Sequence, residues 1–266
     1  MARIKNNVRH RATEDAQEIF SVGGNQLKLT LCVVLCVAIT ILVWLLSDFA
    51  EIAFLIFDVD LGEILPYIAS RILLCLLVLF LASPVYVGTF GLAMRMLRGE
   101  KVEAVDAFDT FSSHKAYGRA LRISLNLFLR ILPLIILLRL PYMLDMLAYY
   151  LVFPAFVYEY SWVAVIIAFP IVALPVSASF GFISFSYLDK NESVRVCVHK
   201  ARKARRGNYR AIYSLAYVTL FKLLLSLLTV GVWTVIHTIP MALLSYASLA
   251  TELKKLSERT DINGTQ

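Results

Sequence analysis

The chain has 266 residues, of which 59% are hydrophobic and 17% are charged, and its mean hydropathy is +0.73. Soluble domains are roughly 45–50% apolar and about 25% charged, so this composition excludes an ordinary soluble domain. The net charge of +7 does not indicate nucleic-acid binding, because the basic residues flank long apolar runs, as the residues that orient membrane proteins do.

The long apolar runs have the length of membrane-spanning helices. Such a helix needs about 20 mostly apolar residues, and only helices and closed barrels satisfy their backbone groups in lipid. The runs alternate too little for barrel strands. We therefore predict an all-α fold, a polytopic transmembrane helical bundle that forms a single membrane domain over 1–266. Its six predicted spans are Leu29–Leu46, Ile68–Met94, Ala120–Leu140, Trp162–Leu188, Ala211–Val230 and Val232–Ala250.

The last two predicted spans share one apolar stretch, Ala211–Ala250. A single helix over this stretch would be about 60 Å long, which is twice the ~30 Å thickness of the hydrocarbon core. Gly231 and Pro240 interrupt the stretch. We place a turn near Thr229–Gly231, so that the six spans form three helix hairpins.

Basic residues are confined to every second segment between the spans. Lys and Arg occur in the N-terminal segment, between the second and third spans, between the fourth and fifth spans, and in the polar tail over 252–266. The segments Ser47–Tyr67 and Pro141–Ser161 contain acidic residues but no Lys or Arg. Because Lys and Arg collect in cytoplasmic segments, this alternation predicts a multi-pass protein of the cell membrane with both termini in the cytoplasm.

Three of the basic segments contain apolar residues at helical spacing. In the third, Arg195, His199, Arg202 and Arg206 form a stripe opposite the apolar positions. We predict that a short amphipathic in-plane helix precedes each hairpin and contacts the anionic inner leaflet. The apolar positions are Val8, Ala12, Ala16, Ile19 and Phe20 in the first segment, Val102, Val105, Phe108 and Phe111 in the second, and Val194, Cys197, Val198, Ala201 and Ala204 in the third.

Regular spacing indicates an internal repeat. The interval from Asn25 to Tyr117 equals the interval from Tyr117 to Tyr209, and Arg130 and Lys222 are separated by the same number of residues. Each even-numbered span also has a proline followed by an aromatic residue and a small residue, as in Pro84 with Phe90-Gly91, Pro175 with Phe180-Gly181, and Pro240 with Tyr246-Ala247. We predict three repeats, over 8–94, 101–188 and 192–251, in which the second span is kinked at proline.

The stretch Phe180–Leu253 carries a family resemblance. Its motifs are Asp189-Lys-Asn191, Arg205-Arg206-Gly207-Asn208-Tyr209, Leu228-Thr-Val-Gly231, Ile239-Pro240 and Ser245-Tyr246-Ala247. The chain thereby resembles a distant member of the bacterial six-span integral membrane proteins catalogued as domain of unknown function 975. The family pattern has an aromatic-rich fifth span and a Pro-Tyr pair in the sixth, whereas here Lys222 lies in the fifth span and Met241 follows Pro240. The resemblance implies a fold and brings no known activity.

Arg130 and Lys222 are cations near the middle of the predicted third and fifth spans. A cation at the centre of a span costs about 2.5–3.5 kcal/mol on insertion scales, and intramembrane charges mark functional sites by default. One hypothesis is therefore a site for an anionic headgroup or substrate. The other is a cation that snorkels or that bonds carbonyls freed at a proline kink.

The sequence contains no motif that indicates an enzyme. It has no HExxH, Walker A, GxGxxG or GxSxG, and its four histidines lack ligand partners at metal-binding spacing. We expect no catalytic residues, no metal and no cofactor. The leading hypothesis is a non-enzymatic scaffold or adaptor that contacts anionic lipid and binds an unidentified membrane-protein partner. The alternatives are a small transporter or transporter accessory subunit, with Arg130 and Lys222 on its path, and a membrane-embedded lipid-processing enzyme.

Overall fold

The computed structural model describes residues 2–56, 64–151, 156–188, 192–227 and 231–263, and the regular structure in these ranges is entirely helical. This confirms the predicted all-α fold. Two π-helical turns, η1 (Val78–Ala82) and η3 (Thr234–Thr238), and one 3-10 helix, η2 (Ala104–Phe111), separate some of the α-helices. The α-helices are α1 (Ala2–Ser21), α2 (Asn25–Ile56), α3 (Ile64–Leu77), α4 (Ser83–Leu97), α5 (His114–Leu151), α6 (Phe156–Leu188), α7 (Val194–Arg205), α8 (Tyr209–Leu227) and α9 (Ile239–Asn263).

Five helical stretches among the described residues are long and apolar enough to cross a membrane, as in a multi-pass membrane protein. They contain or overlap the predicted first, second, third, fourth and sixth spans. The helix α8, which contains most of the predicted fifth span, is not among them. Residues 229 and 230 of the predicted turn lie outside the described residues, and Gly231 has a φ of 72°. The five stretches are Asn25–Phe49, Ala69–Leu97, His114–Leu138, Trp162–Ser179 and Thr234–Leu256.

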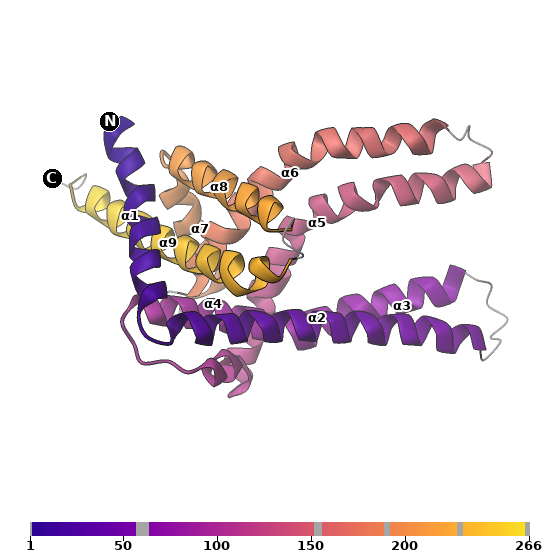
Figure 1. The fold of residues 1–266 in the computed structure, drawn as a ribbon, viewed down its shortest axis with the longest axis horizontal. Helices are drawn as coiled ribbons and strands as arrows, with labels where there is room; N and C mark the ends of the chain where they lie inside the picture. Colours follow the sequence, from indigo (N-terminus) through magenta and orange to yellow (C-terminus); the bar gives the residue numbers. More distant parts are fainter. Residues whose placement is uncertain (1, 57–63, 152–155, 189–191, 228–230, 264–266) are drawn as a thin grey trace.

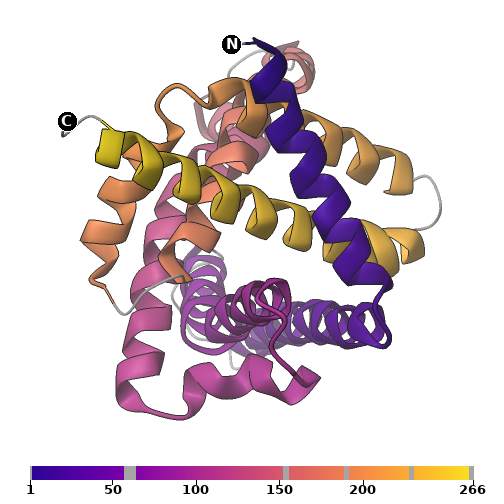
Figure 2. The ribbon, with the colours of Figure 1, turned by 90° about the vertical axis from the view of Figure 1, so that its left-hand side faces the viewer.

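The helix pairs differ in length. The helix α2 lies beside α3 and α4, and α5 lies beside α6, and both pairs extend in the same direction from the end that holds the termini (Figure 1). The pair α8 and α9 is shorter, and these two helices extend only part of the way along α2 (Figure 1). At the terminal end, α1 crosses α9 (Figure 2). The bundle is therefore thickest near the termini.

Three proline-bearing helices contact one another at the centre of the bundle. The helices α4, α6 and α9 pack together, and in addition α4 packs on α5, α6 on α8, and α9 on α2.

Each proline lacks an N–H, so the carbonyl four residues earlier loses its usual helical donor. The Tyr117 hydroxyl donates to the Phe80 carbonyl at 2.9 Å, four residues before Pro84.

A second freed carbonyl is bonded in the same way. The Thr30 hydroxyl of α2 donates to the carbonyl of Ile236 at 2.9 Å, four residues before Pro240. The π-helical turns η1 and η3 each end two residues before one of these prolines. Hydroxyls from adjoining helices thus replace the missing bonds and hold the helix pairs against each other.

The apolar faces of two predicted amphipathic segments are buried within the protein. Ala12 and Ala16 on α1 have no exposed surface, and Cys197 and Ala201 on α7 are nearly as buried. The helix α1 packs on α8 and α9, and α7 packs on α6 and α9. The expectation that these faces contact lipid is therefore wrong, because neighbouring helices of the same chain cover them. The second segment is a 3-10 helix instead of an α-helix, and its apolar face is described below.

Cys197 provides a test of the packing of α7. Burial raises the pKa of its thiol above the ordinary value, so the thiol is protonated at neutral pH and is shielded from solvent. We expect a water-soluble maleimide to label Cys197 severalfold more slowly than a cysteine placed at the exposed neighbouring position by Val196→Cys in a Cys197→Ala background. Mass spectrometry of the α7 peptide would measure both rates. Equal rates would contradict the packing of this face against the bundle.

Candidate lipid-contact surfaces

The 3-10 helix η2 is held against α4 by one of its three faces. A 3-10 helix has three residues per turn, so positions three apart lie on one face. Ala107 is fully buried, and the Thr110 hydroxyl donates to the Pro84 carbonyl at 2.9 Å. A Cβ at Gly88 would lie 1.8 Å from the Ala107 carbonyl oxygen. Glycine at this position therefore permits the close approach of η2 to α4.

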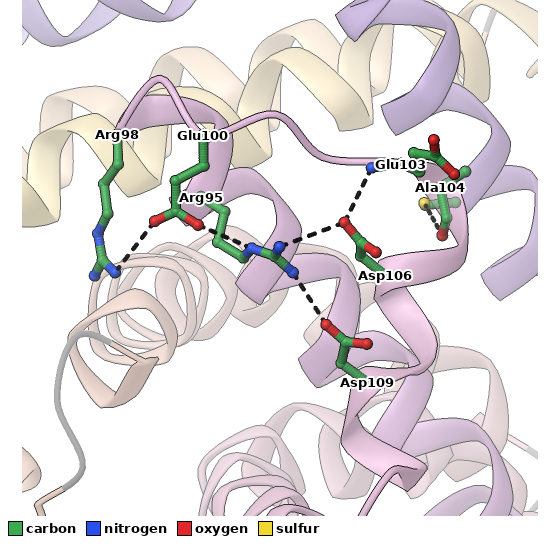
Figure 3. A network of polar contacts seen from close by, with 8 residues as sticks. Arg95, Arg98, Glu100, Glu103, Ala104, Asp106 and Asp109 are labelled. Atoms are coloured by element: carbon green, nitrogen blue, oxygen red, sulfur yellow. Dashed lines mark hydrogen bonds and ion pairs between the residues drawn. The ribbon is translucent and has the colours of Figure 1, made fainter.

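A second face of η2 is acidic and bonds to Arg95 (Figure 3). The Arg95 guanidinium lies 3.0 Å from Asp109 and 3.5 Å from Asp106, and its Nε donates to Glu100 at 3.0 Å. The Asp106 carboxylate also accepts from the backbone N–H of Glu103 at 3.0 Å, which caps the start of η2. One cation at the end of α4 thus fixes both the preceding loop and the rotation of η2.

The third face of η2 is an exposed apolar stripe, the η2 stripe, made of Val105, Phe108 and Phe111. These side chains are 63%, 40% and 42% exposed, and the ring of Phe111 lies 5.7 Å from that of Tyr117. Because η2 packs beside Pro84 and Gly88, which lie within the candidate span Ala69–Leu97, the stripe lies beside a candidate membrane span. Its position suits contact with lipid.

Three of the four predicted residues lie on one exposed surface of α7, and the fourth, Arg206, directly follows the helix; these four residues are called the basic stripe. Arg195, His199, Arg202 and Arg206 are all exposed, opposite the buried Cys197, Ala201 and Ala204. The neighbouring Lys200 lies outside the stripe and bonds to Glu192 at 2.7 Å. The structure therefore gathers Arg195, His199 and Arg202 on a single helix surface, and Arg206 is exposed at the C-terminal end of that helix.

Arg130 and Lys222 are not brought together. Arg130 is half-buried on α5, and its Nε donates to the Asn126 side chain at 3.0 Å. Lys222 is exposed on α8, about 8 Å along the helix from its end at Leu227. The ammonium can therefore reach the end of the helix by snorkelling. The helix α5 packs on α4 and α6, whereas α8 packs on α6, α9 and α1.

Sequence reasoning assigned the η2 stripe to an α-helix in which Val102 shares its face. Val102 is in fact buried before η2 begins, while the other three residues are exposed. The repeat of three in Val105, Phe108 and Phe111 was the signal for a 3-10 helix. In the described ranges no three His, Cys, Asp or Glu side chains are grouped as metal ligands.

No protein-family model, curated protein or solved structure matches this chain. The functional inference therefore rests on the surfaces of the molecule itself.

Gly88→Ala tests the attachment of η2. Because the new Cβ would overlap a backbone carbonyl, η2 must shift, and we expect a loss of about 1–3 kcal/mol in unfolding free energy. Gly91→Ala is the matched control on the same helix, since nothing lies within 4 Å of the place that its Cβ would take, and alanine there should stabilise by about 0.5–1 kcal/mol. Thermal unfolding in detergent measures both. Similar melting temperatures for the two variants would contradict the described packing.

Proposed function

We propose that this protein is a non-enzymatic membrane scaffold or adaptor whose cytoplasmic end binds anionic lipid headgroups. The observation that carries the proposal is the basic stripe of α7, in which four cationic or titratable side chains are exposed while the opposite face is sealed against the bundle. Basic residues that serve only to orient the chain in the membrane need positive charge, but their side chains need not be held in a fixed direction. Burial of Cys197, Ala201 and Ala204 fixes the direction in which the stripe faces.

Electrostatic attraction supplies most of the proposed affinity. Each Lys or Arg near an anionic leaflet contributes about 1 kcal/mol, and salt weakens the contribution. Arg195, Arg202 and Arg206 supply the guanidinium groups of the stripe, which bind phosphate oxygens through planar, bidentate hydrogen bonds. The η2 stripe adds apolar contact with the same leaflet.

The topology that we propose has six spans in three hairpins, both termini in the cytoplasm of the cell, and three repeated units. The alternation of basic and non-basic segments supports it, as does the cyclic packing of α4 on α5, α6 on α8 and α9 on α2. In this topology α8 is the fifth span and Lys222 snorkels toward the outer interface. The motifs from Phe180 to Leu253 support membership of the family catalogued as domain of unknown function 975.

The transporter hypothesis places Arg130 and Lys222 on one path. Lys222 is exposed and Arg130 bonds to Asn126, so the described geometry favours the scaffold. A lipid-processing enzyme would need a cluster of catalytic side chains at the membrane surface. The clustered carboxylates of Glu100, Asp106 and Asp109 are all paired with Arg95, which favours a structural role for them.

The double substitution Arg195→Gln with Arg202→Gln tests the basic stripe. Removing two cations should weaken retention of phosphatidylglycerol by roughly tenfold to thirtyfold at low salt, since about 1 kcal/mol is lost per cation. Retention of phosphatidylcholine should not change. Native mass spectrometry of the detergent-purified protein with each lipid measures both quantities.

Lys255→Gln is the matched control for this test, because it removes an exposed cation from α9 that already bonds to Glu252 at 2.9 Å. The control should leave phosphatidylglycerol retention near that of the unchanged protein. An equal loss in the control and in the double variant would show a general effect of net charge and would refute a lipid site on α7.

Val232→Cys tests the six-span topology, in which α8 is the fifth span. Val232 is 59% exposed beside the α8–α9 turn, so a membrane-impermeant thiol reagent added to intact cells should label it if α8 crosses the bilayer. Lys101→Cys, in the basic segment before η2, should be labelled only after permeabilisation. Labelling of Val232→Cys that also requires permeabilisation would mean that α8 and α9 do not reach the outer surface.

A further inference from the structure

A cavity of about 170 Å³ lies among α2, α4 and α9. These helices provide three of the candidate spans, so the cavity is at membrane depth. It occurs where α9 begins, next to η3 and Pro240, and the helices α8 and α9 extend only part of the way along α2 (Figure 1). The gap is thus a consequence of the short third helix pair.

The polar groups of the cavity wall are bonded to each other. The Thr40 hydroxyl donates to the Cys36 carbonyl at 2.7 Å and also bonds to the Tyr86 hydroxyl. The Thr89 hydroxyl donates to the Val85 carbonyl at 2.9 Å, and its oxygen lies 3.4 Å from the Cys36 sulfur. A bound water needs two to four polar partners. Because these groups already have partners within the wall, the cavity suits an apolar occupant.

The cavity opens toward lipid. Its back consists of buried side chains, including Val33 and Phe90, whereas Val37 and Leu243 near the opening are half-buried and Thr40 is exposed. On the same helix Val34 and Ile41 are exposed, so the surface of α2 that flanks the opening faces the bilayer. Hydrocarbon chains are therefore the apolar groups that surround the opening.

We propose that this cavity binds a segment of the acyl chain of a bilayer lipid. An apolar cavity of about 150 Å³ accommodates a benzene molecule, so this one holds about six carbon atoms of a chain. The proposal concerns the apolar tail of the lipid and is independent of the headgroup contacts proposed for α7. A chain held here would fill the space between α2 and α9 and join the third helix pair to the first.

The test uses the full-length protein in phosphatidylcholine vesicles that contain a phosphatidylcholine with a diazirine on its acyl chain. After illumination, mass spectrometry locates the labelled residues. We expect label on the cavity residues Ile239 and Leu243 of α9. Val37→Trp should reduce that label severalfold by filling the opening, whereas Val34→Trp, one turn away on the exposed surface of α2, should not.

Leu243→Phe fills the cavity from α9 and provides a second variant if Val37→Trp fails to fold, with label then read on the α2 and α4 wall. Loss of label in a folded cavity-filling variant supports the proposal. Label confined to outward-facing residues such as Leu31 and Ile41, or label in the cavity that neither filling variant reduces, would overturn it. Crosslinks to a second copy of the chain in place of lipid would also overturn it.

Discussion

The need to satisfy backbone hydrogen bonds in lipid determines how the helix pairs are joined. Pro84 and Pro240 each remove a donor from a helix that lies among other apolar helices, and an unsatisfied carbonyl there costs several kcal/mol. Tyr117 and Thr30 supply the missing donors from adjoining helices. The first bond joins two consecutive helix pairs across 37 residues, and the second joins the first pair to the third across 206 residues. The prolines that weaken individual helices thereby specify which helices become neighbours.

Three similar sequence patterns have different structural roles. The apolar faces of α1 and α7 pack against the bundle, whereas that of η2 is exposed. The difference arises from the residues on the remaining faces of these elements and from what those residues contact. On η2 the acidic side bonds to Arg95 and the side with Ala107 fits against Gly88, so the apolar side is left to face outward. On α7, none of the contacts described above joins the basic stripe to an acidic residue of a neighbouring helix. The basic side of α7 therefore remains exposed.

Local patterns allowed the sequence to predict the helical fold and the basic stripe, because the length of an apolar run and a spacing of 3.6 residues require no knowledge of distant contacts. The 3-10 form of η2 was missed because a period of three and one of 3.6 are hard to tell apart over eight residues. The surroundings of Lys222 depend on which side of α8 meets α6 and α9. The cavity depends on where α9 begins beside α2, and its hydroxyl pair joins Thr40 to Tyr86 from separate helices. Such features follow from tertiary packing and have no local signal.

The contacts between the two ends of the chain have a consequence for biosynthesis. The helix α1 emerges from the ribosome well before α8 and α9, yet it packs on both of them, and Thr30 donates to a carbonyl just ahead of α9. These surfaces of α1 and α2 therefore remain uncovered until α8 and α9 have been synthesised. A nascent chain arrested before α9 would expose the small residues Ala12 and Ala16 and the unpaired hydroxyl of Thr30, which are features by which a membrane chaperone or protease could distinguish unfinished from finished protein.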